Sequence, residues 1–154
     1  MTLRLYEGFD RDGPSPQDLI DACVEFATVA PGVRHEPCPD AILATLQDPG
    51  VDWAYVSDGD GLAGFLLLAE GRPWYVAAES GSWGLEDIGF YVRPERRHGG
   101  RTADLLLSWA EVWSRVQSMP LSIGISSGER HEAFGRMMRA RGYAECARMY
   151  RFEP

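Results

Sequence analysis

The chain has 154 residues, of which 45% are hydrophobic and 25% charged, values typical of one compact domain spanning 1–154. Its net charge of −8 argues against broad, non-specific nucleic-acid binding, which needs a basic face. No apolar run approaches the roughly 20 residues of a membrane span, and Met1–Glu7 lacks the layout of a signal peptide. We therefore expect a cytoplasmic protein with no membrane partner. Cys23, Cys38 and Cys146 are odd in number and widely scattered, so they predict neither a disulfide framework nor a metal site.

The first part of the chain predicts a strand followed by two helices. Leu3–Phe9 alternates apolar and polar residues, as a half-buried strand does. Ser15–Asp18 is typical of a helix start, with an N-cap serine, a proline at the first helical position and an acid two residues later. That helix is expected to end at Pro31-Gly32. A second helix begins at Pro39 and ends at Pro49-Gly50, and both helices carry apolar residues at helical spacing.

Three further strands are predicted in the middle of the chain. Val51–Val56 and Leu62–Leu68 are joined by Ser57–Gly61, a strong hairpin signal. Gly71–Gly84 is polar and irregular, which indicates a loop or a long hairpin connection. Leu85–Val92 is the expected fourth strand.

The remaining elements are expected to be a helix over Thr102–Ser118, a strand over Leu121–Ile125, a helix over Arg130–Arg141 capped by Gly142, and one or two closing strands over Tyr143–Phe152. The first of these helices is expected to bury one wide apolar stripe: Leu105, Leu106, Trp109, Val112, Trp113 and Val116. The order β-α-α-β-β-β-α-β-α-β predicts a mixed α/β sheet with helices on both faces.

The turn between the fourth strand and the long helix carries the clearest chemical signal. Four arginines lie within nine residues against a single acid: Arg93, Arg96, Arg97 and Arg101 against Glu95. Backbone N–H groups and the dipole of a helix N-terminus attract anions, glycines let the backbone approach a phosphate, and arginines bind phosphate bidentately. The charges alone could be a solvated cluster. Together with the glycines and the strand-to-helix position, they predict a site for a small polyanionic ligand.

This turn and the order of elements resemble the GNAT superfamily of acyl-CoA-dependent N-acyltransferases. In that family a Val-x-Pro at the end of the fourth strand is followed by (Gln/Arg)-x-x-Gly-x-(Gly/Ala). Val92, Pro94, Arg97 and Gly100 fit this spacing, while Thr102 stands at the final small position. The resemblance implies an α/β fold with a GNAT-like mixed, mostly antiparallel sheet of six or seven strands. Helices would cover both faces, and the sheet would be splayed between strands 4 and 5.

The resemblance also implies acetyl-CoA, or another acyl-CoA, as co-substrate and no metal. The pyrophosphate of CoA would bind along the turn, at Arg97, His98, Gly99, Gly100, Arg101 and Thr102. Pantetheine would pair with the main chain near Tyr91 and Val92. His131 aligns with an asparagine that touches the cofactor in the family, so it could contact pantetheine or simply lie on the surface.

Acyl transfer to an amine requires a general base. Glu86, six residues before Val92, lies where many of these enzymes carry a catalytic glutamate, and it is the leading candidate. Strand alternation places Glu86, Ile88, Phe90 and Val92 on one face and Asp87 on the other. Burial beside apolar neighbours would raise the pKa of a carboxylate here, which suits a base. The alternative is a pair of solvated acids at the start of a strand.

The general acid is the position at which this chain departs from the family. Family members often place a tyrosine four residues before the glycine that ends the last helix, and here that position is Met138. Methionine cannot donate a proton, which favours a packing role. Tyr143 and Tyr150 are possible substitutes, although neither has the expected spacing.

The resemblance therefore implies an N-acyltransferase that moves an acyl group, foremost acetyl, to a primary amine by direct attack in a ternary complex. The expected partner is a small-molecule or peptide amine, and a homodimer is possible. Two alternatives stay open. One is acylation of a modified nucleic-acid base, which the acidic charge disfavours. The other is a non-catalytic acyl-CoA-binding module, which Met138 and Thr102 favour.

Overall fold

The computed structural model of the chain describes residues 3–9, 12–29, 36–71, 84–97, 99–124 and 131–145. It divides into two compact units, Met1–Gly124 and Ile125–Pro154. The first unit holds the sheet, and the second holds helix α4 (His131–Ala140). Within the described ranges, no helix combines the length and the apolar character needed to cross a membrane.

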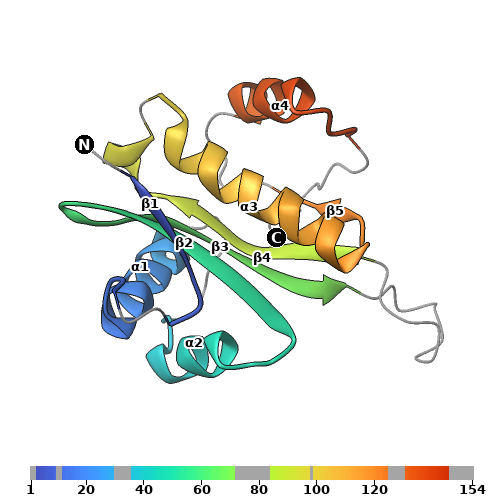
Figure 1. Ribbon diagram of the computed structural model, residues 1–154. Helices are drawn as coiled ribbons and strands as arrows, with labels where there is room; N and C mark the ends of the chain where they lie inside the picture. The colour runs from blue at the N-terminus through green and yellow to red at the C-terminus, as the bar shows by residue number, and fades with distance from the viewer. Residues whose placement is uncertain are drawn as a thin grey trace, which may run out of the picture. The chain divides into compact units, whose positions relative to one another are not determined.

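The sheet of the first unit has five strands in the order β1-β2-β3-β4-β5 (Figure 1). Their bounds are Arg4–Glu7, Val51–Asp58, Gly61–Gly71, Gly84–Val92 and Leu121–Ser122. β1 to β4 pair in antiparallel fashion, and β5 runs parallel to β4. This confirms a mixed, mostly antiparallel sheet. Residues 143–145 form no strand, and the rest of the predicted closing strands, 146–152, lies outside the described residues.

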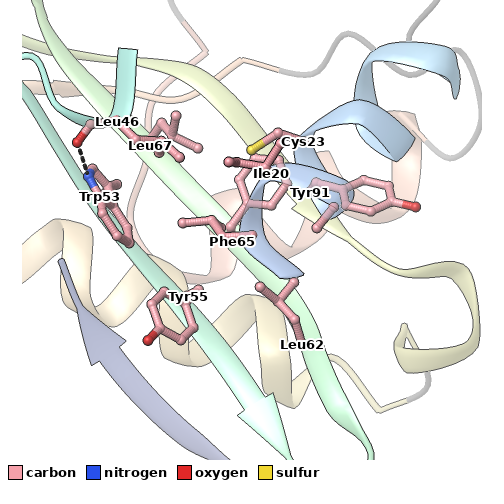
Figure 2. Close-up of a cluster of buried hydrophobic side chains, with 11 residues drawn as sticks. Ile20, Cys23, Leu46, Trp53, Tyr55, Leu62, Phe65, Leu67 and Tyr91 are labelled. Atoms are coloured by element: carbon pink, nitrogen blue, oxygen red, sulfur yellow. Dashed lines mark hydrogen bonds between the residues drawn. The ribbon is translucent and has the colours of Figure 1, made fainter. Parts of the chain in front are cut away.

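Helices α1 (Pro16–Val29) and α2 (Pro39–Leu46) pack against one face of the sheet. Their buried side chains join those of the strands in one cluster, most of which is labelled in Figure 2: Leu19, Ile20, Ala22, Cys23, Leu46, Trp53, Tyr55, Leu62, Phe65, Leu67 and Tyr91. The indole N–H of Trp53 donates to the carbonyl of Leu46 at 2.9 Å, which ties the end of α2 to β2. This cluster defines the α1/α2 face of the sheet.

Helix α3 (Arg101–Gln117) covers the opposite face, so helices on both faces are confirmed. The second cluster joins α3 to side chains of β2, β3 and β4: Ala54, Val56, Ala63, Leu66, Leu68, Leu85, Leu106, Trp109 and Ala110. The predicted stripe is wrong at Val112 and Val116, which are 54% and 65% exposed, whereas Leu107 is fully buried. Val112 lies about 120° around the helix from Leu106, which puts it beyond the face that meets the sheet.

Local start and turn signals fold as the sequence predicts. The backbone N–H of Ser15 donates to Asp18 Oδ2 at 2.9 Å, and the N–H of Asp18 donates to Ser15 Oγ at 3.2 Å. This reciprocal pair forms the capping box expected at the start of α1. In the β2–β3 hairpin, the N–H of Asp60 donates to Asp58 Oδ1 at 2.9 Å, which closes the turn before Gly61.

Candidate active site

A β-bulge in β4 sets the geometry of the candidate site. Along β3, Leu67 pairs with Gly89 while Leu68 pairs with Asp87, so Ile88 is an extra residue with no partner in β3. Its side chain is 48% exposed. Because the extra residue shifts the alternation by one, residues an even number of positions apart lie on opposite faces of the sheet when the bulge lies between them.

The bulge reverses the predicted face of Glu86. Asp87 pairs with Leu68, which belongs to the cluster beneath α3, whereas Glu86 pairs with Ala69 and therefore points to the α1/α2 face. Phe90 and Val92 lie against the cluster beneath α3. The expectation that Glu86 shares a face with Phe90 and Val92 is therefore wrong, because it assumed an uninterrupted alternation.

β4 and β5 separate immediately before the bulge at Ile88. Their parallel pairing covers only Leu85 with Leu121 and Glu86 with Ser122. At the next step the N–H of Gly124 donates to the carboxylate Oδ1 of Asp87, at 2.5 Å, and not to the main chain of β4. The predicted splay between strands 4 and 5 is confirmed, and Asp87 bridges its narrow end.

The edge of β4 that faces the splay is defined by the ladder with β3. The N–H of Arg93 donates to the carbonyl of Ala63 at 3.0 Å. Because bonded pairs alternate along an antiparallel ladder, the main chain of Tyr91 faces β3, while the main-chain groups of Phe90 and Val92 face the opposite edge. Val92 is thus oriented as the pantetheine prediction requires. Phe90, which was not among the predicted pantetheine contacts, is oriented better than Tyr91.

The turn after β4 leads into the start of α3, where N–H groups have no backbone acceptor among the described residues. The short 3₁₀ helix η2 (Pro94–Arg96) is followed by Gly99 and Gly100, whose φ angles of 79° and 69° are left-handed. A Cβ on either glycine would meet nothing within 4 Å, so conformation and not space requires glycine there. The first helical bond runs from the N–H of Asp104 to the carbonyl of Gly100, at 2.9 Å.

The N–H groups of residues 101–103 consequently have no backbone acceptor within the described chain. Together with the positive end of the helix dipole they form an anion site. His98, which the resemblance predicts as part of that site, lies outside the described residues.

Two arginines near the turn are already engaged by acids. Arg96 contacts Asp58 Oδ2 and Asp60 Oδ2, both at 3.3 Å, and the Asp58 side chain is fully buried. Arg93 donates through Nε to Glu25 Oε2 at 3.1 Å. These contacts join the turn to the rest of the first unit and so position it. Because the acids partly neutralise Arg93 and Arg96, these two side chains cannot offer a ligand their full positive charge.

The other two arginines retain donors for an anion. Arg97 donates through Nε to the carbonyl of Val92 at 2.8 Å, which holds its side chain against the end of β4 and leaves both Nη groups for other partners. Arg101 is exposed at the first position of α3 and forms no ion pair within the described residues. The cationic groups best placed for a phosphate are therefore Arg97 and Arg101.

Thr102 departs from the small residue of the family motif, and the structure accommodates it through Gly64. Thr102 is only 3% exposed. A Cβ on Gly64 would lie 3.1 Å from Thr102 Cγ2 and 2.6 Å from the carbonyl oxygen of Tyr91. The missing side chain on β3 thus makes room for the extra methyl group on α3.

The two candidate carboxylates occupy different environments. Glu86 is exposed, and its carboxylate lies beside Gly71, where an added Cβ would be 2.5 Å from Oε1. Asp87 is half-buried, and burial raises its pKa despite the opposing hydrogen bond from Gly124. The raised pKa that the sequence analysis expected of a carboxylate here therefore occurs at Asp87.

The second unit contains the remaining predicted positions. α4 begins at His131, whose side chain is not described, so its predicted contact with pantetheine stays a prediction. Met138 is 7% exposed, which agrees with a packing role. Gly142, with a φ of 90°, ends the helix as expected, since the N–H of Tyr143 donates to the carbonyl of Met138 at 3.0 Å. Tyr150 lies outside the described residues.

These elements define an acetyltransferase fold: a mostly antiparallel sheet, helices on both faces, and a splay between β4 and β5 beside the start of α3. The solved structure of AAC(6')-Iy in complex with the bisubstrate analogue CoA-S-monomethyl-acetylneamine aligns with a TM-score of 0.67 and 16% identity, over 100% of this chain and 99% of its own. The aminoglycoside 6'-N-acetyltransferase AAC(6')-Ih from Acinetobacter baumannii aligns with a TM-score of 0.66 and 15% identity, over 99% and 98% of the two chains.

A ribosomal-protein-alanine N-acetyltransferase from Brucella melitensis biovar Abortus aligns with a TM-score of 0.69 and 12% identity, over 99% of each chain. No protein-family model matches the sequence, and no curated protein matches it. At these identities the likeness establishes the fold. The activity has to be argued from the residues of the site.

Proposed function

We propose that this chain is a GNAT-type N-acyltransferase that moves an acetyl group from acetyl-CoA to a primary amine. The observation that carries the proposal is the start of α3. There, three N–H groups that have no backbone acceptor among the described residues lie at the end of a strand whose outer edge has separated from β5. A diphosphate binds such N–H donors, and the pantetheine amides can pair with an open strand edge.

The CoA pyrophosphate would contact the N–H groups of residues 101–103 and the side chains of Arg97 and Arg101. Gly99 and Gly100 leave the backbone uncovered on that side, since a Cβ at either position would point into open space. Pantetheine would follow the edge of β4 formed by Phe90 and Val92. To pair with the carbonyl of Val92 it would displace or share the bond from Arg97.

In the proposed reaction the neutral amine attacks the acyl carbon, the C–S bond breaks, and the CoA thiolate leaves. Glu86 takes one proton from the amine, directly or through water. Its carboxylate lies on the α1/α2 face of the sheet, so the amine would approach from that face. Asp87, on the other side of the strand, is the competing base, because it is half-buried and burial raises its pKa.

The acceptor is proposed to be an amine of a small molecule or a peptide. Relatives in fold are named for aminoglycosides and for a ribosomal-protein alanine, both of which supply amines. Acylation of a nucleic-acid base is a weaker proposal, because Arg93 and Arg96 are engaged by acids within the fold. A non-catalytic acyl-CoA-binding module is the second candidate, and the buried Met138 in the position of the expected tyrosine favours it.

Binding is tested first, by the shift of the melting temperature with acetyl-CoA. A ligand at 100 times its dissociation constant stabilises the folded protein by about 2.7 kcal/mol. Arg97→Glu is expected to abolish that shift, while Arg115→Glu, at an exposed position in the last turn of α3, is expected to retain it. No shift with the unmodified protein would refute the proposed function.

Catalysis is tested by thiol release from acetyl-CoA with a panel of amines. Glu86→Gln is expected to lower kcat by about 10²–10⁴-fold, the usual contribution of a general base. Asp87→Asn is the matched variant, because asparagine can still accept the hydrogen bond from Gly124. A greater loss in Asp87→Asn would transfer the base role to Asp87. Binding of acetyl-CoA without turnover on any amine would favour the non-catalytic module.

A further inference from the structure

We propose that the first unit has a second ligand site, which binds an organic ammonium ion. The site is a pocket of about 150 Å³ between the end of β1, the start of β2 and the second half of α3. On the α3 face of the sheet its walls include two tryptophans and two acids: Trp109, Trp113, Glu7 and Asp52. None of these residues belongs to the proposed acyl-CoA site, so the inference is independent of the proposed function.

The charge of the pocket selects a cation. Among the described residues that line it there is no lysine, arginine or histidine. Glu7 makes no ion pair or hydrogen bond within the described residues, and Asp52 uses only Oδ2, which accepts the indole N–H of Trp113 at 2.7 Å. Asp52 Oδ1 and the Glu7 carboxylate therefore remain as acceptors for a positive group, and the net charge of −8 adds a long-range attraction.

The indole rings select an organic cation over a metal ion. The faces of tryptophan rings attract ammonium groups, most strongly where water is partly excluded. The indole N–H of Trp113 is bonded to Asp52, so this ring offers the pocket no free donor for an anion. In the described part of the chain, no group of three or more histidine, cysteine, aspartate or glutamate side chains could hold a metal.

The size of the pocket suits a small ammonium head. Cavities of about 150 Å³ admit a benzene-sized molecule, and a trimethylammonium group is of similar size. After Glu7 the chain turns away at Gly8, whose φ of 60° is left-handed and whose N–H donates to the carbonyl of Trp53 at 3.3 Å. This turn fixes the wall of the pocket at the β1 end.

Choline tests the proposal, with 3,3-dimethyl-1-butanol as its uncharged counterpart of nearly the same shape. Each is titrated into the full chain at constant ionic strength, and binding is followed by tryptophan fluorescence and by broadening of the ligand methyl signal in NMR. Choline is expected to give a saturable change and the alcohol none. Equal binding of the two would refute a cation site, and so would the absence of a saturable change with choline.

Variants of single carboxylates locate the binding. Asp52→Asn retains an acceptor for the indole N–H of Trp113, and it is expected to weaken choline binding by about tenfold, as loss of a hydrogen-bonded charge does. Glu70→Gln removes one exposed carboxylate of β3 outside the pocket and is expected to leave the affinity unchanged. Equal losses in the two variants would mean general charge attraction, and would overturn the assignment of this pocket.

Discussion

Asp87 is the residue whose titration the structure makes most informative. Burial raises its pKa above the usual 3.8, so the folded state holds this proton more tightly than the unfolded state does. The stability of the native state therefore falls as the pH rises from 3.8 through the folded pKa, and it stays lower above that value. Asp87→Asn, which retains an acceptor for Gly124, is expected to raise the melting temperature at neutral pH.

The pH dependence of this rise in melting temperature tests whether burial of the Asp87 charge is its cause. At about pH 3 aspartate is protonated in both states, so the wild type and Asp87→Asn should melt at the same temperature. Thermal unfolding at pH 3 and pH 7 measures both values. A gain that is the same at the two pH values would mean that burial of the charge is not its cause.

Gly71 holds a position on which the orientation of Glu86 depends. An added Cβ would lie 2.5 Å from Glu86 Oε1, so Gly71→Ala has to displace the carboxylate. Because the displaced group is the end of a flexible, exposed side chain, we expect a stability change within about 1 kcal/mol. If Glu86 is the base, kcat should fall by about tenfold or more, since small displacements of a reacting group are costly.

Gly59→Ala is the matched control for Gly71→Ala. Gly59 lies in the β2–β3 turn, and a Cβ there meets nothing within 4 Å. Steady-state acetyl transfer measures both variants. An unchanged kcat in Gly71→Ala, with Glu86→Gln inactive, would show that the carboxylate can reach the amine from its displaced position.

At the scale of elements, the contact between β3 and the start of α3 depends on a missing side chain. Gly64→Ala would place a Cβ 2.6 Å from the carbonyl oxygen of Tyr91, which belongs to the main chain and cannot rotate away. We expect a destabilisation of about 2 kcal/mol, as overpacking of a core produces. Chemical denaturation measures the change, with Gly59→Ala expected to stay within about 0.5 kcal/mol.

A second substitution separates the two contacts of Gly64. Thr102→Ser removes the methyl group that lies 3.1 Å from the added Cβ but leaves the carbonyl of Tyr91 in place. The double variant is therefore expected to recover only part of the lost stability. Full recovery would mean that Thr102, and not the main chain of β4, sets the spacing between β3 and α3.

The sequence predicted those elements whose signals are local. The capping box of Ser15 with Asp18 and the glycine that ends α4 each depend on residues a few positions apart, and both are confirmed. The bulge at Ile88 has no such signal, because it is a property of the register between β3 and β4. Missing it placed Glu86 on the wrong face of the sheet. The exposure of Val112 likewise depends on how α3 lies on the sheet.

The same distinction applies to the candidate site. The glycines and arginines of the turn form a contiguous run, so the anion site was predictable from their spacing. The acids that engage these arginines come from elsewhere in the chain: Arg96 contacts Asp58, and Arg93 contacts Glu25 on α1. Such pairings depend on tertiary structure. They also reduce the free positive charge, which the sequence pattern alone overestimates.

At the scale of the whole molecule, several long-range polar contacts between described residues meet at the end of β4. Glu25 on α1 accepts the hydroxyl of Tyr91 at 2.6 Å and Nε of Arg93 at 3.1 Å, joining positions 66 and 68 residues apart. Burial first, and then Glu25, raises the pKa of Tyr91. The carboxylate accepts from the neutral phenol and repels the phenolate. The helix is thereby fixed to the strand that leads into the anion site.

Glu25→Gln tests this connection. Glutamine can still accept from Tyr91 but loses the ion pair with Arg93, which is partly exposed, so we expect a loss of about 1 kcal/mol and a melting temperature lower by roughly 2–4 °C. The pKa of Tyr91 should fall, which a spectrophotometric tyrosine titration detects. Glu132→Gln removes a fully exposed partner of Arg136 and should change the stability by less than about 0.5 kcal/mol. Equal effects of the two variants, with an unchanged tyrosine titration, would mean that Glu25 does not fix α1 to β4.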